Sequence, residues 1–97
     1  MSNKLKCQET DQLFQGICSL NSLEECYQFF EDICTINEIQ AMTQRFQVAK
    51  MLREDKVYTE ISTKTGASTA TISRVKRALN YGTDGYDLVI NRLKEKE

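Results

Sequence analysis

The chain has 97 residues, of which 28% are charged and 40% are hydrophobic, and its formal net charge is −1. This composition is typical of one folded globular domain and excludes a disordered chain. Proline is absent and there are only four glycines, which disfavours a sandwich or barrel and favours an all-α fold. The apolar runs are too short to span a membrane and the N-terminus has no apolar signal segment, so we predict a cytoplasmic protein.

Apolar residues recur at helical spacing through the first half of the chain. They predict helices at about 9–20, 23–34 and 36–54. Two pairs, Ser22 with Glu25 and Thr35 with Glu38, match the capping box that opens a helix. The second and third helices are therefore predicted to begin at these pairs.

The second half of the chain predicts three further helices. A short one covers about 58–65, with Ile61 pointing inward, and ends at Gly66. The next begins at about Ser68 and stops at Tyr81–Gly82. Thr83 or Asp84 is then expected to cap a sixth helix, which forms the C-terminal segment 83–97.

Four cysteines, at positions 7, 18, 26 and 34, form no C-x-x-C motif, and the chain has no histidine. This pattern supports neither a disulfide framework nor a metal site, so the cysteines are predicted to be small buried hydrophobic residues. Without histidine, a His-based catalytic triad is impossible, and no glycine-rich phosphate loop is present. We therefore do not expect an enzyme.

Charge is distributed unevenly along the chain. Residues 7–40 hold seven acidic residues and no basic ones, whereas residues 41–81 hold eight basic and three acidic residues. An asymmetry of this kind often marks an anion-binding face, although a mixed surface produces it too.

Residues 58–77, YTEISTKTGASTATISRVKR, predict a helix-turn-helix motif. The positions that pack its two helices together are apolar: Ile61, Ala67, Ile72 and Val75. Gly66 lies at the tightest point of the turn, where a residue that tolerates positive φ is needed. Thr65 departs from the pattern, because an aliphatic residue is more usual there.

The second helix of this motif has an exposed face that suits DNA. A helical wheel directs Ser68, Ile72, Val75 and Leu79 to the core and Thr69, Ala70, Ser73, Arg74, Arg77 and Asn80 outward. Small and hydroxyl residues at the N-terminal end allow a close approach to base edges in the major groove. The basic residues further along, with Lys64 and Lys76, are predicted to bind phosphates. The alternative is a plain capped helix with a solvated basic face.

Two motifs resemble the Trp repressor superfamily: T-G-A-S-T-A-T-I-S-R at 65–74 and T-x-N-E-x-x-A-M-x-x-R at 35–45. Within that superfamily the chain is most similar to the YerC/YecD group of Trp-repressor-like proteins. The resemblance implies an intertwined, all-α homodimer that binds a palindromic operator as a transcriptional regulator and acts as a repressor. On this basis residues 1–57 are expected to form the dimerisation helices.

The resemblance also implies DNA-contacting positions on both helices of the motif. Together with the wheel, it gives the predicted DNA-binding set Tyr58, Thr59, Ser62, Lys64, Ser68, Thr69, Ala70, Thr71, Ser73, Lys76 and Arg77. A base-reading arginine of the Trp repressor corresponds to Thr59 here. The operator is therefore expected to differ.

The tryptophan site of the Trp repressor corresponds to Thr35, Arg45 and Arg74 in this chain. Two further positions differ, because Val75 replaces a glycine and Ala78 replaces a serine. We expect the valine to intrude on the indole slot and the alanine to lose a hydrogen bond to the ligand's ammonium group. We therefore expect this chain to share DNA binding with the Trp repressor more than binding of a tryptophan-like corepressor. No other cofactor is expected.

Arg45 and Arg74 are then expected to hold a different ligand or to pair with acidic residues such as Glu38. Two functions remain as alternatives to a DNA-binding regulator. One is a helical adaptor for protein–protein contact, whose acidic first half docks a basic partner. The other is an amino-acid-responsive repressor.

Overall fold

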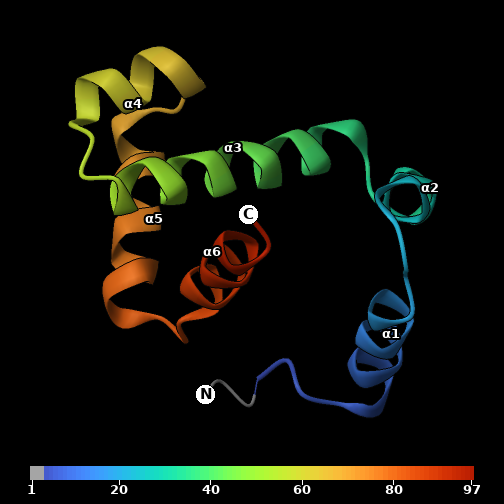
Figure 1. Cartoon of the computed structure of the whole chain (residues 1–97). Coiled ribbons are helices and arrows are strands. Elements are labelled where there is room, and N and C mark those ends of the chain that lie inside the picture. Colours follow the sequence, from blue (N-terminus) through green and yellow to red (C-terminus); the bar gives the residue numbers. More distant parts are fainter. Residues whose placement is uncertain (1–3) are drawn as a thin grey trace. The chain divides into compact units, whose positions relative to one another are not determined.

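The computed structural model describes residues 4–97. Over these residues the chain forms six α-helices and no strand (Figure 1), which confirms the predicted fold class. The helices are α1 (Gln8–Cys18), α2 (Leu23–Ile33), α3 (Ile36–Arg53), α4 (Tyr58–Thr65), α5 (Thr69–Tyr81) and α6 (Gly85–Glu95). None of them is long and apolar enough to cross a membrane. The chain divides into two compact units, residues 1–39 and 40–97.

Capping side chains fix where the helices of the first unit begin. The Glu25 amide donates to Ser22 Oγ over 3.1 Å, while the Glu25 carboxylate accepts from the amide of Asn21, one residue before the predicted partner. Thr35 and Glu38 form the complete capping box, with hydrogen bonds of 2.7 and 3.1 Å. The hydrogen bond from the Thr35 amide, and after it the Thr35 side chain, lowers the pKa of the Glu38 carboxyl.

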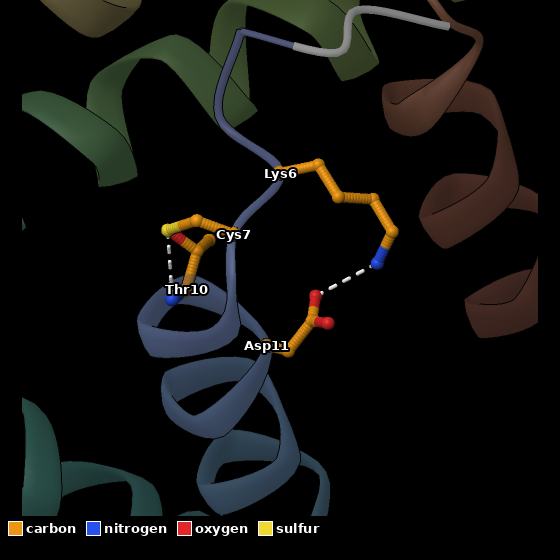
Figure 2. A network of polar contacts seen from close by, with 4 residues as sticks. All are labelled: Lys6, Cys7, Thr10 and Asp11. Atoms are coloured by element: carbon orange, nitrogen blue, oxygen red, sulfur yellow. Dashed lines mark hydrogen bonds and ion pairs between the residues drawn. The ribbon is translucent and has the colours of Figure 1, made fainter.

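The N-cap residue of α1 is a cysteine, Cys7, instead of the usual hydroxyl or carboxylate residue. Figure 2 shows Cys7 Sγ accepting a hydrogen bond from the Thr10 amide over 3.4 Å, with the Thr10 hydroxyl 3.1 Å away. The Thr10 hydroxyl is the main reason that the pKa of the Cys7 thiol is lowered, and the Thr10 amide adds to it. Beside this cap, Lys6 Nζ pairs with Asp11 over 2.8 Å.

The apolar side chains of the first unit are not buried within one chain. Neither α1 nor α2 contains a buried residue, and Leu23 and Tyr27 are 80% and 67% exposed. The prediction of buried cysteines is therefore wrong for the single chain: Cys7 and Cys18 are exposed, and Cys26 and Cys34 are partly buried. The physical reason is that two helices provide too little apolar surface to enclose these side chains.

The second unit has the core of the chain. It is built from all four of its helices and consists of Val48, Ala49, Ile61, Ala67, Ile72, Val75, Leu79 and Ile90. The inward positions predicted for Ile61, Ile72, Val75 and Leu79 are confirmed. Ser68 was predicted to face this core as well, but it is exposed because it lies at the N-cap, one residue before α5 begins.

A polar link joins three helices at the edge of this core. The Arg53 guanidinium binds both carboxylate oxygens of Asp87 over 2.8 Å and also donates to the Leu79 carbonyl over 3.4 Å. This bidentate pair lowers the pKa of Asp87 and raises that of Arg53, in each case chiefly through the hydrogen bonds between the two side chains. The link therefore ties the start of α6 to the ends of α3 and α5.

The predicted cap of α6 is only partly right. Asp84 occupies the N-cap position but provides no side-chain hydrogen bond, and its φ of 66° lies in the left-handed region. At the other end of this connection, a Cβ on Gly82 would collide with the Ala78 carbonyl oxygen. The close return of the chain after α5 therefore requires glycine at this position.

Candidate nucleic-acid interface

Helices α4 and α5 are joined by a short turn (Figure 1), and the glycine between them gives this turn its conformation. Gly66 has φ 75° and ψ 3°, and its amide donates to the Ser62 carbonyl over 2.8 Å. This left-handed conformation ends α4 and costs an L-residue more than it costs glycine. The turn predicted from the sequence is thus present at the predicted residue.

Hydroxyl side chains around the turn satisfy its backbone groups. Ser62 Oγ donates to the Ala67 carbonyl over 3.0 Å. Thr65 Oγ1 donates to the Ile61 carbonyl over 2.7 Å and accepts from the Ala67 amide over 3.1 Å. The threonine that departs from the aliphatic pattern therefore replaces packing with two hydrogen bonds that hold the turn.

A long-range hydrogen bond supports the same turn from α3. Gln44 Nε2 donates to the Thr65 carbonyl over 3.1 Å, across 21 residues of sequence. Only the packing of α3 against α4 gives this side chain its partner.

Ser68 caps the N-terminus of α5. Its Oγ accepts from the Thr71 amide over 3.1 Å and lies 3.1 Å from the Thr71 hydroxyl. Thr71 is partly buried beside it. Both hydroxyls of this predicted DNA-binding pair therefore have a structural role at the helix start, and Ser68 remains accessible from solvent.

The outward face of α5 is uniformly exposed and carries no acidic residue. Its exposed members are Thr69, Ala70, Ser73, Arg74, Lys76, Arg77 and Asn80. Small side chains occupy the first turn, and the three basic residues follow in the middle of the helix. The structure thus brings the predicted base-reading and phosphate-binding residues onto one surface.

Helix α4 contributes residues of different character. Thr59 is exposed, and Tyr58 is partly buried against the core. Lys64 pairs with Glu60 over 3.3 Å within the helix, which compensates part of its charge. The N-cap residue Val57 provides no side-chain hydrogen bond, so the first amides of α4 have no side-chain cap.

The positions predicted for an effector are divided between the two units. Thr35 belongs to the first unit and uses its amide and hydroxyl in the capping box. Arg45 and Arg74 are exposed, and neither forms an ion pair within residues 40–97. Glu38 was the predicted acidic partner of these arginines, and its carboxylate accepts a hydrogen bond from the Thr35 amide.

Arg45 lines a pocket of about 600 Å³ between α3, the end of α5 and α6. Most of the pocket wall is apolar, with Met42, Phe46, Ala78, Tyr86 and Val89 beside the arginine. Arg74 does not line it. Val75, predicted to intrude on an effector slot, lies in the core instead with 2% of its surface exposed.

A model of the Trp repressor protein family matches residues 8–94, nearly the whole chain. The chain therefore belongs to the Trp repressor family, as predicted from its two motifs. This family consists of regulators and not of enzymes, and its DNA-binding motif is a helix-turn-helix such as α4 and α5 form here.

Individual relatives agree with this assignment. The chain is 62% identical over 95 residues to the uncharacterized protein YerC of Bacillus subtilis (strain 168), covering 98% of this chain and 91% of YerC. Among solved structures, a TrpR-like protein from Eubacterium eligens ATCC 27750 has a TM-score of 0.93 and 66% identity, covering 96% of both chains. A putative Trp repressor from Staphylococcus aureus has a TM-score of 0.93 and 50% identity, covering 97% of this chain and 95% of its own.

Proposed function

We propose that the protein is a sequence-specific DNA-binding transcriptional regulator that acts as a homodimeric repressor in the cytoplasm. The observation that carries the proposal is the exposed face of α5, which has small side chains first, basic ones next and no acidic residue. Helix formers such as Glu would suit water better than the Ser and Thr of this face. Membership of the Trp repressor family supports the same function.

In the proposed complex, α5 enters the major groove with its N-terminal turn against base edges. Thr69, Ala70 and Ser73 read the bases, because short side chains permit close approach and hydroxyls donate or accept hydrogen bonds. Lys76 and Arg77 bind phosphates and supply the salt-dependent part of the affinity. Thr59 and the uncapped start of α4 face the flanking backbone.

A homodimer is supported by the apolar surface of the first unit. Leu13, Phe14, Leu23, Tyr27 and Ile33 are all exposed large hydrophobic residues of α1 and α2. Surfaces of this kind mark protein–protein interaction sites. Light scattering at micromolar concentration tests the dimer, and a monomer would contradict it.

DNA binding is tested by selecting duplexes from a random pool and measuring their affinity by fluorescence anisotropy. Arg77→Ala is expected to weaken binding to all sequences alike and to reduce the salt dependence by about one phosphate contact for each protomer. Changes at Thr69 or Ser73 are expected to alter sequence preference instead. Lys94→Ala, in the last turn of α6, is the matched charge control. Absence of binding to any duplex at low salt would contradict the proposal.

The pocket beside Arg45 favours a second candidate, a repressor that responds to an amino acid or similar effector. Its apolar wall with a single arginine suits a small apolar carboxylate. Calorimetry with free tryptophan tests the effector that the family resemblance suggests. Saturable binding that is lost in Arg45→Ala would support it, and no heat of binding would exclude tryptophan.

An adaptor function makes a different prediction about the dimer. A DNA-binding dimer presents its two α5 helices about 34 Å apart, one turn of the duplex. An adaptor has no such requirement, and its acidic residues 7–40 would bind a basic protein partner. Measuring the distance between spin labels on the two α5 helices distinguishes these functions.

A further inference from the structure

The two lysines of the helix-turn-helix differ in the side chain that each ammonium group contacts. Lys64 lies 3.3 Å from the Glu60 carboxylate on its own helix. Lys76 instead places its Nζ 5.7 Å from the centroid of the Tyr58 ring, across the motif, and has no ion pair within residues 40–97. An aromatic face attracts an ammonium group without cancelling its charge.

The ring that holds Lys76 is itself fixed. Tyr58 is the first residue of α4, and its side chain is partly buried against the core residues of the second unit. Lys76 is exposed on α5, on the acid-free face that also carries Ser73 and Arg77. The ammonium therefore connects the middle of α5 to the start of α4 through its contact with a neutral ring.

A lysine side chain is long and flexible, so ordering it on a phosphate normally costs conformational entropy. A lysine that is already held over a ring loses less freedom when it binds. The ammonium has three N–H donors, and contact with one ring face leaves donors available to an anion. The arrangement preorganises a phosphate contact between the middle of α5 and the start of α4.

We infer that Tyr58 is a positioning residue that holds Lys76 for a DNA backbone phosphate, so that both helices of the motif contribute to one phosphate contact. This inference rests on the proposed DNA-binding function. It predicts that Lys76 and Tyr58 act as one unit, whereas Lys64 contributes less because Glu60 shares its charge. Tyr58 would then affect the affinity without touching a base.

The geometry is tested first without DNA, by NMR on the full chain. The ring of Tyr58 should shift the Lys76 ε-methylene protons upfield, and the shift should persist in Tyr58→Phe and disappear in Tyr58→Leu. Leucine keeps apolar bulk against the core, and a thermal melt checks that the variant folds. Lys76 protons at random-coil positions in the wild type would overturn the inference, however well the protein binds DNA.

The function is tested by the salt dependence of binding to a non-specific duplex, followed by anisotropy from 50 to 200 mM salt. Lys76→Met should reduce the slope of log K against log salt by about 0.9 for each protomer on the duplex, so the loss of affinity over this range is roughly 3.5-fold smaller per protomer. Tyr58→Leu should weaken binding at each salt concentration, Tyr58→Phe should not, and the double variant should match Lys76→Met alone. Lys50→Met, whose ammonium lies 5.9 Å from the Phe46 ring on α3, is the charge control and should leave the slope unchanged.

The outcomes separate the inference from the proposed function. Additive effects of Tyr58→Leu and Lys76→Met on the affinity, or an unchanged affinity in Tyr58→Leu, overturn the positioning role while DNA binding stands. Wild-type protein that fails to bind any duplex at low salt overturns the proposed function, and the phosphate contact with it.

Discussion

The conformation of Gly66 makes a quantitative prediction about the turn between α4 and α5. Its φ of 75° lies in the left-handed region. A Cβ added there would meet only Gln44 Nε2, at 3.9 Å, which is an ordinary van der Waals contact. Gly66→Ala therefore introduces backbone strain without a steric clash. The strain costs an L-residue about 1–2 kcal/mol.

Part of this cost is offset in the unfolded state, because alanine has less conformational entropy to lose, an effect of about 0.4–1 kcal/mol. We therefore expect Gly66→Ala to reduce the free energy of unfolding by about 1 kcal/mol, which lowers the Tm of a domain this size by roughly 4–8 °C. Asparagine tolerates the left-handed region better than alanine does, so Gly66→Asn should reduce the free energy of unfolding by less.

The assay is urea or thermal unfolding at one fixed protein concentration. Gly16 provides the matched control, since it lies inside α1 with no atom within 4 Å of an added Cβ and without a positive φ. Gly16→Ala should increase stability by about 0.5–1 kcal/mol, because glycine is unfavourable within a helix. If Gly66→Ala stabilises the protein as Gly16→Ala does, the reasoning about the turn is wrong.

Three further predictions concern caps and charges. Ser68→Ala removes the hydroxyl that caps α5 and should cost about 1 kcal/mol of stability, measured by urea unfolding; an unchanged midpoint would contradict the role of the cap. Thr10→Val removes the hydroxyl that is the main cause of the lowered pKa of Cys7 (Figure 2). The alkylation rate of this thiol, followed by site-resolved mass spectrometry, should therefore rise at a higher pH than in the wild type. An identical pH profile in the two proteins would refute this cause. The pKa of Asp87 is held below its ordinary value of 3.8 by Arg53, so the stabilisation from this pair is present above that pH and lost as the pH falls further. Arg53→Met should therefore destabilise the protein at pH 7, and the difference from the wild type should narrow at pH 3; a difference that is constant with pH would exclude an ionic contribution.

The relation between sequence and fold is clearest where the signal is local. Helical periodicity gave the six helices to within two residues at each end, because each repeat depends only on neighbours one turn apart. The Thr35–Glu38 capping box and the Gly66 turn are equally local, since the bonds and dihedral angles concerned lie within a few residues. The family resemblance carried by 35–45 and 65–74 is also a property of the sequence.

Side chains with distant partners required the tertiary structure. Gln44 supports the Thr65 carbonyl, Lys76 lies over Tyr58, and Arg53 binds Asp87 across 34 residues. No short-range pattern encodes these contacts, because they depend on how α3, α5 and α6 pack around the core of the second unit.

Burial was predictable only where one chain contains its own core. In the second unit, apolar spacing correctly placed Ile61 and Ile72 inside. In the first unit, the same spacing on α1 and α2 marks a stripe that the chain itself does not cover, so Cys18 and Leu23 are exposed. The sequence by itself determined which faces are apolar, and only the tertiary structure decided which of them are buried, because burial depends on a second surface being packed against the first.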